Sequence, residues 1–315
     1  PVRFGGLAVP VHVTEPVTMT PQRRVRPQGL LFAEDGRLRN LLYSTDGSGG
    51  VSIATALART DDGGRSWTDH ADNPVLDRIE SDWQGRRAFG TAITRDEAND
   101  RWVMATVGDD TSPHTPGMRA AGLWFSKDLV HWTQHEGNPI LTVETDDALN
   151  NETILPGPDD PPVGMYIRHF HRMQGAWYAL VQWRGDKSER GWSRMTVMKS
   201  EGDLTGPWRF ESRCLAPEDA SDWLNANRNL NWSQPVRVEG RWYAACQNGV
   251  AADHVNNTYV GIVYSDDYRR WHEFDNPVTP SLSRPDGSEV VSSQQVLLPP
   301  ERGKPWRILL GARGV

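Results

Sequence analysis

The protein has 315 residues, of which 37% are hydrophobic and 24% are charged, and its formal net charge is −7. This composition excludes a disordered chain and a small disulfide scaffold, and no window is apolar enough to predict a membrane-spanning helix. The acidic balance argues against a general affinity for nucleic-acid phosphates, so an anionic ligand needs a focused basic site. Two cysteines, Cys214 and Cys246, allow at most one disulfide.

The chain opens with PVRFGGLAVP, which has neither the basic region nor the apolar run of a signal peptide. A signal peptide is therefore either absent or already removed. The sequence leaves the localisation unknown: the protein is expected to be soluble, and either secreted or cytoplasmic.

Tryptophan is unusually frequent, with 14 residues against 7 Phe and 7 Tyr. Four of these tryptophans close a recurring phrase in which Ser or Thr and then Asp precede a turn; they are Trp67, Trp132, Trp208 and Trp271. A second phrase lies 29 to 31 residues upstream of each, centred on Leu38, Trp102, Trp177 and Trp242. Such a repeat, with β-rich runs between Gly, Asp and Asn turns, is typical of the four-stranded blades of a β-propeller.

The repeat predicts an all-β protein, a single-domain five-bladed β-propeller. Trp306 marks a fifth blade that lacks an outer strand of its own, so we expect the N-terminal segment, residues 2–17, to complete it and remove an exposed edge. The expected blades span residues 22–75, 85–141, 163–215, 229–278, and 288–315 together with 1–17.

Functional residues of a propeller gather where the inner strand of each blade begins, and on the loops between second and third strands. Counting back from the upstream phrases places these beginnings in five segments. They are VRPQGLLF (25–32), RRAFGTAI (86–93), YIRHFHRM (166–173), NWSQPVRV (231–238) and SSQQVLL (292–298).

Basic and aromatic side chains recur in and near these segments. Their arginines either bind a carboxylate or sulfate through the guanidinium fork or pair with acids at the blade rims, and the sequence leaves both readings open. Trp183 provides a flat face either for a sugar ring or for packing between blades. The predicted substrate-binding residues are Arg26, Arg87, Arg168, Arg228, Trp183, Arg184, Gln234 and Gln294.

The predicted catalytic residues are His169, Asp46, Tyr166, His114 and His254. We expect His169 to face the channel as a base, with neighbouring Arg168 disfavouring its charged form. Adjacent side chains of a strand alternate, so both face the channel only if a bulge intervenes. No ligand spacing indicates a metal site, and no cofactor is predicted.

The phrase TDDGGRSW resembles the Asp-box of sialidases, a structural hairpin in that family. Thr60, Asp62, Gly64, Ser66 and Trp67 occupy its signature places.

The phrases SKDLVHWT and SEGDLTGPW, together with the tails NPVL and NPIL, resemble turns of the five-bladed arabinanase and invertase-like glycosidases. This resemblance implies a glycoside hydrolase. That family carries its carboxylates at the inner-strand beginnings of blades one, three and four. Here Arg26, His169, and Ser233 or Gln234 stand in those places.

Three functions follow from these patterns. The first is a glycoside hydrolase with relocated carboxylates such as Asp46, acting on a glycan that contains a uronate, sialate or sulfated sugar. The second is a polysaccharide or oligosaccharide lyase, with His169 or Tyr166 as the base and arginines neutralising a uronate. The third is a non-catalytic glycan-binding propeller. All three predict an oligosaccharide or polysaccharide partner, with no nucleic acid and no membrane, and leave the oligomeric state open.

Overall fold

The computed structural model describes most of the predicted strands. The described residues are 2–4, 7–9, 26–32, 37–47, 53–78, 80, 82–85, 87–110, 117–142, 144–150, 164–184, 193–215, 231–247, 260–274, 292–299 and 306–312.

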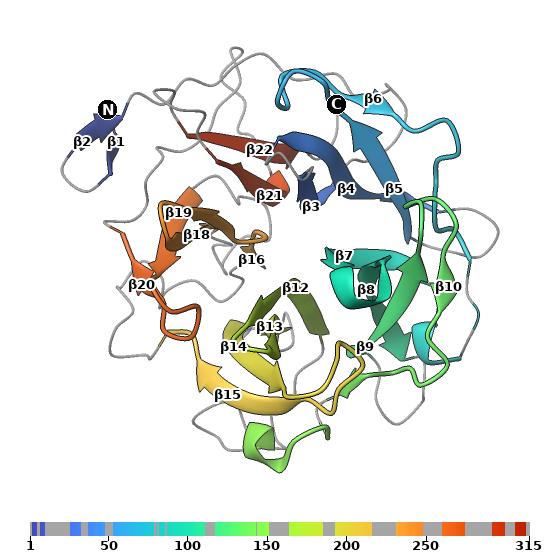
Figure 1. The fold of residues 1–315 in the computed structure, drawn as a ribbon. Helices are drawn as coiled ribbons and strands as arrows, with labels where there is room; N and C mark the ends of the chain where they lie inside the picture. Colours follow the sequence, from blue (N-terminus) through green and yellow to red (C-terminus); the bar gives the residue numbers. More distant parts are fainter. Residues whose placement is uncertain are drawn as a thin grey trace.

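Four antiparallel blades are arranged in a ring (Figure 1). The first contains β3 (Arg26–Phe32), β4 (Leu38–Asp46), β5 (Ile53–Arg59) and β6 (Thr68–Asp69). The second contains β7 (Phe89–Asp96), β8 (Arg101–Asp110), β9 (Gly117–Ser126), β10 (Thr133–Gln134) and β11 (Leu141–Thr142). The third contains β12 (Gly164–Met173), β13 (Ala176–Arg184), β14 (Ser193–Ser200) and β15 (Arg209–Arg213). The fourth contains β16 (Asn231–Trp232), β17 (Val236–Val238), β18 (Arg241–Gln247), β19 (Val260–Ser265) and β20 (His272–Glu273).

The remaining sector of the ring holds a two-stranded sheet of β21 (Ser292–Leu298) and β22 (Arg307–Ala312), between the fourth blade and the first (Figure 1). The architecture is therefore the predicted all-β propeller. The count of five blades stays a prediction, because much of the chain on either side of β21 and β22 lies outside the described residues.

The N-terminal strands β1 (Val2–Phe4) and β2 (Leu7–Val9) pair with each other. Within the described part of the chain, neither pairs with β21 or β22. The expected closure of the last blade by residues 1–17 stays a prediction, since residues 10–17 lie outside that part.

The five segments predicted as inner strands coincide with β3, β7, β12, β16 with β17, and β21, which surround the centre of the ring (Figure 1). We call the end of the ring at which these strands begin the upper face, and the end at which they finish the lower face. Short 3₁₀ turns complete the described structure: η1 (Asp82–Gln84), η2 (Glu97–Asn99) and η3 (Asp147–Asn150).

Apolar side chains fill the spaces between neighbouring blades. One cluster joins the first and second blades, one the second and third, and one the third and fourth. A further cluster joins the fourth blade to the first through Val296, Leu297 and Leu298 of β21, so the hydrophobic core follows the whole ring. Burial of one large apolar side chain contributes roughly 1.5–3 kcal/mol, which makes these seams the main source of stability. Cys214 and Cys246 are buried in the core as free thiols, without a disulfide.

The recurring Trp phrases form the turns between the third and fourth strands of the four blades. In three of them the Asp carboxylate accepts two backbone N–H bonds of 2.8–3.0 Å and pairs with the preceding hydroxyl; these carboxylates belong to Asp62, Asp128 and Asp267. The Trp that follows each turn is buried between blades. The repeat is therefore structural, and the specific likeness of residues 60–67 to a sialidase Asp-box stays a prediction.

The NPVL and NPIL tails have a structural reason as well. The carboxamide of Asn73 bonds both the N–H and the C=O of Leu57, at 2.9 and 2.7 Å. Asn138 binds Leu123 in the same way, at 2.8 and 2.9 Å. Each asparagine thus occupies the hydrogen-bonding edge of a third strand, which satisfies backbone groups that would otherwise be unpaired.

Candidate functional site

Most of the predicted site residues lie at the upper face. β-Sheet register places Arg26 beside Ser44 and Arg184 beside Gly164, while a parallel bridge joins Arg87 to Ile53. The predicted residues at this face are Arg26, Asp46, Arg87, Tyr166, Arg168, Trp183, Arg184 and Gln294. For Arg26, Arg184 and Gln294 the structure describes the backbone alone. His114, Arg228 and His254 lie outside the described residues.

Arg168 is the centre of a buried polar cluster at this face. Its Nε and Nη2 donate to Oε1 of Gln182, at 2.9 and 2.6 Å. Its guanidinium carbon lies 4.7 Å from the centre of the Tyr166 ring, which in turn packs edge-on against Phe89. Only 3% of Arg168 is exposed. The guanidinium of Arg168 and the ring of Tyr166 therefore lie together at the beginning of β12, and their predicted roles toward a substrate stay predictions.

Asp46 ends β4 at the upper face, and its side chain is exposed. Its cross-strand partner Ile53 packs against a small buried group formed by Phe89, Val107 and Tyr166. Asp46 is thus an exposed carboxylate held one strand away from the Arg168 cluster.

Trp183 is not a sugar-stacking residue, which corrects one of the two readings of the sequence. Its ring is fully buried in the seam between the second and third blades. The indole N–H donates to Thr196 Oγ1 at 2.9 Å, so the polar edge of the ring is satisfied inside the core. With no exposed face, Trp183 packs blades together.

A β-bulge between Ile167 and His169 shifts the register of β12. The bulge that the prediction required is present, but Arg168 and His169 nevertheless pack in different surroundings. Arg168 belongs to the buried polar cluster with Gln182 and Tyr166, whereas His169 packs toward the fourth blade. Its Nδ1 lies 2.9 Å from the hydroxyl of Tyr268, and its ring is 5.5 Å from that of Trp242.

His169 is held neutral, as expected, but for another reason. Burial lowers its pKa to about 3, and the neighbouring imidazole of His171 adds to the effect. The two rings stack with centroids 6.4 Å apart. Arg168 is not among the causes, which corrects the sequence-based explanation. A base with so low a pKa is poorly matched to proton abstraction near neutral pH.

The side-chain amide of Gln234 is hydrogen-bonded to the backbone of the first blade. Its Oε1 accepts the N–H of Leu30 at 2.6 Å, and its Nε2 donates to the carbonyl of the same residue at 3.2 Å. A side chain of the fourth blade thereby holds the inner strand of the first.

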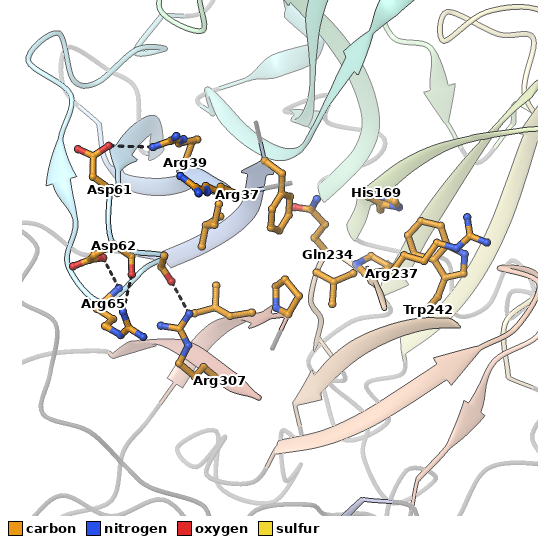
Figure 2. Close-up of a pocket in the computed structure, with 17 residues that line it drawn as sticks. Arg37, Arg39, Asp61, Asp62, Arg65, His169, Gln234, Arg237, Trp242 and Arg307 are labelled. Carbon is orange, nitrogen blue, oxygen red and sulfur yellow. Dashed lines mark hydrogen bonds and ion pairs between the residues drawn. The ribbon is translucent and has the colours of Figure 1, made fainter. Parts of the chain in front are cut away.

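A cavity of about 770 Å³ opens near the lower face, and two of the predicted site residues, His169 and Gln234, are among the residues that line it (Figure 2). One wall comes from the start of β4 and the turn before β6, another from β21 and β22, and the last from β17 with His169 and Trp242 behind it. Its charged lining residues are Arg37, Arg39, Asp61, Asp62, Arg65, Arg237 and Arg307. A sequence signal existed for part of this lining, because basic residues recur where inner strands end and second strands begin, in GRLR, VRVEG and KPWR.

The two carboxylates of this lower cavity are already committed. Asp61 lies 3.4 Å from Arg39 and 2.9 Å from Arg59. Asp62 accepts from the hydroxyl and N–H of Ser66, which hold its pKa well below the usual range, with Thr60 and Arg65 contributing. Asp62 is therefore not poised to exchange a proton near neutral pH, and Asp61 is engaged by two arginines.

Within the ranges that the structure describes, no group of three or more His, Cys, Asp or Glu side chains could hold a metal ion. No described helix is long and apolar enough to cross a membrane.

No known family model matches the sequence, and no curated protein resembles it closely enough to be matched. Solved structures are nevertheless similar in fold. A thermostable family-43 glycoside hydrolase has a TM-score of 0.55 at 14% identity, over 96% of each chain. An endo-arabinase from Bacteroides thetaiotaomicron has a TM-score of 0.52 at 12% identity, over 93% of this chain and 95% of the other.

A GH32 β-fructofuranosidase from Bombyx mori has a TM-score of 0.54 at 12% identity, over 90% of this chain but only 55% of the enzyme. The resemblance of the turns to arabinanase and invertase-like propellers is thus confirmed at the level of the fold. At these identities the likeness establishes the fold alone.

Proposed function

We propose that the protein is a glycoside hydrolase whose reaction centre lies at the upper face. The observation that carries this proposal is the fold likeness along nearly the whole chain to proteins named as a family-43 glycoside hydrolase and an endo-arabinase. A propeller alone hosts many functions, so the residues at the face must supply the chemistry.

Glycosidic hydrolysis needs two carboxyl groups, one that protonates the leaving oxygen and one that activates water or attacks the sugar. Asp46 supports the proposal because it is exposed at the upper face, and its cross-strand partner Ile53 packs against the group that contains Tyr166. We assign it one of the two roles. Asp109 and Asp110, which end β8 at the upper face, are candidates for the second carboxylate. The sequence also offers Glu152, which lies outside the described residues.

Arg168 supports a substrate that carries an acidic sugar. A buried guanidinium is costly to desolvate, and it makes its strongest bonds to carboxylate or sulfate oxygens. Tyr166 and Gln182 fix its orientation from two sides. Only 3% of Arg168 is exposed, so its charge acts on a uronate, sialate or sulfated unit bound beside Asp46 through its field rather than by direct contact.

The predicted bases His169 and Tyr166 support the lyase alternative less well. Elimination needs a strong enough base beside the uronate, and His169 is both a weak base and bonded to Tyr268. Tyr166, the other predicted base, is buried under the Arg168 guanidinium.

The test is incubation with matched neutral and uronic-acid oligosaccharides, read by product mass and by the ultraviolet absorbance of an unsaturated uronate. Hydrolysis adds the mass of one water per cleavage and no absorbance, which is the expected result. Products with the new absorbance would establish the lyase instead. Binding without any cleavage of the panel would leave a glycan-binding propeller.

A further inference from the structure

The lower cavity concentrates positive charge in a chain whose net charge is −7. Five arginines and two aspartates line it. Guanidinium groups gathered in one cavity repel one another, and an anion between them relieves that repulsion. We propose that the lower cavity is a second, non-catalytic site, which binds a sugar chain through its carboxylate or sulfate groups.

Arg237 shows how the cavity can present a fixed charge. Its Nε donates to the carbonyl of Gly240 at 3.3 Å, and its guanidinium carbon lies 5.7 Å from the centre of the Trp242 ring. These contacts hold the group from behind. A guanidinium has five N–H donors in a planar fork, which matches two oxygens of a carboxylate or sulfate.

Arg39, Arg65 and Arg307 lie on the opposite wall, around the turn that contains Asp62 (Figure 2). Arg307 donates to the carbonyl of Gly63 at 2.6 Å, which ties β22 to that turn. Charges therefore face the cavity from two walls, and a ligand with acidic groups on successive sugar units could meet both.

The positive charge of Arg237 also acts on the neighbouring imidazole of His171. The pKa of His171 is lowered to about 4, by burial first and then by the charge of Arg237.

The shape of the cavity favours a sugar-borne anion over a free one. A volume of about 770 Å³ lies in the range of sites for whole organic ligands, roughly 300–1,000 Å³. Phe32, Pro235 and Pro299 add apolar surface, which suits the C–H faces of a sugar ring. A free sulfate ion has the charge but leaves this surface uncovered.

The test uses the full chain with Asp46→Asn, so that the upper-face reaction does not consume the ligand. Binding of an oligogalacturonate, of a neutral arabino-oligosaccharide and of sodium sulfate alone is measured by calorimetry. Each titration is repeated with the double variant that carries both Asp46→Asn and Arg237→Gln. The matched control is Arg172→Gln, because Arg172 is also an exposed arginine that lies over a tryptophan, 5.9 Å from the Trp177 ring.

We expect Arg237→Gln to weaken oligogalacturonate binding by about tenfold or more, as loss of a charged hydrogen bond does, and Arg172→Gln to leave it unchanged. Saturation with the ligand should raise the pKa of His171 in an NMR titration, because the anion opposes the field of Arg237. Equal binding by both arginine variants would overturn the proposal. Sulfate that binds as tightly as the oligosaccharide would overturn its sugar component. Neither outcome depends on whether the upper face hydrolyses glycans.

Discussion

Asp46 and Asp62 are both exposed carboxylates of the first blade, yet their surroundings differ. Asp62, at the lower face, accepts hydrogen bonds from its own turn, and its pKa lies well below the usual range. Asp46, at the upper face, ends a strand above a buried aromatic group. Proton transfer needs a carboxyl group that can change its charge, whereas a turn needs one that cannot.

The arginines of the two faces differ as well, but here the buried and bonded group lies at the upper face. Arg168 is buried at the upper face and bonded to Gln182, while Arg37, Arg65 and Arg237 are exposed at the lower cavity. The upper face thus combines an exposed carboxylate with one buried guanidinium, whereas the lower cavity combines several arginines with two carboxylates that are already hydrogen-bonded or ion-paired. This difference is the basis of the two proposals, a reaction centre at the upper face and a binding site at the lower one.

The largest expected effect comes from Asp46→Asn, which keeps the shape of the side chain and removes its charge. Turnover of a hydrolysed oligosaccharide should fall by roughly two to four decades, as the loss of a positioned acid or base does. The melting temperature should stay unchanged because the side chain is exposed. Asp61→Asn, at the lower cavity, is the control and should keep its turnover. Full activity of Asp46→Asn would move the reaction centre elsewhere.

Trp183→Ala tests whether the upper end of β13 belongs to the core or to a sugar site. The ring is fully buried, so its removal should lower the free energy of unfolding by roughly 3–5 kcal/mol. Trp102→Ala, at a half-buried ring, should cost less. Urea denaturation of both variants measures the difference. A stable Trp183→Ala protein with weakened sugar binding would restore the stacking role.

Acid should destabilise the protein through the histidines behind the lower cavity. The pKa values of His169 and His171 are about 3 and 4 when folded, against 6.5 ordinarily. Between pH 6.5 and about 4 the unfolded chain therefore binds more protons, so the free energy of unfolding falls as pH falls, by at most about 1.4 kcal/mol per pH unit for each proton. His131, whose pKa is raised by Asp128, acts in the opposite direction at the surface.

Urea midpoints at pH 7, 6 and 5 measure this slope. His171→Phe removes one of the two groups, so its midpoint should depend less on pH than that of the unchanged protein. An identical pH dependence of the two chains would show that His171 titrates normally when folded.

The sequence predicted the fold well because the fold depends on repeated local patterns. The turn hydroxyls and carboxylates, such as Thr60 and Asp62, recur at regular spacing and act within their own turns. The position of each inner strand follows from that spacing. Trp183 was ambiguous for a physical reason, because a tryptophan suits a blade seam and a sugar platform equally well.

The lower cavity could not be predicted, because its residues come from separate blades and only the closed ring brings them together. Arg237 and Arg39 are ordinary surface residues within their own strands. His169 was placed at the channel because it stands where the five-bladed glycosidases carry a carboxylate, but its side chain packs against Tyr268 of the fourth blade.

His169→Phe should therefore behave as a change in the core. It leaves the buried hydroxyl of Tyr268 without its imidazole partner, at a cost of roughly 1–3 kcal/mol of unfolding free energy. Turnover should fall by less than about tenfold, against the two to four decades expected of a catalytic base. Thermal unfolding and steady-state kinetics of the same preparation separate the two effects. A stable but inactive variant would return His169 to the reaction.

Asp62→Asn is expected to have the smallest effect. It should lower the stability of the protein slightly, and it should leave binding at the lower cavity unchanged or slightly stronger. The variant keeps the shape of the turn acceptor but loses the charge that strengthens its bonds to the N–H groups of Arg65 and Ser66, so the unfolding free energy should fall by about 1 kcal/mol. The lining of the cavity gains one unit of positive charge at the same time. Oligogalacturonate should bind at least as tightly as before, because an aspartate in this turn contributes repulsion and no contact.

Asp128→Asn, in the equivalent turn of the second blade, is the matched control: it should lose the same stability and leave binding unchanged. Weaker binding by Asp62→Asn alone would mean that its carboxylate positions Arg65 for the ligand, and that the turn is part of the site rather than its support.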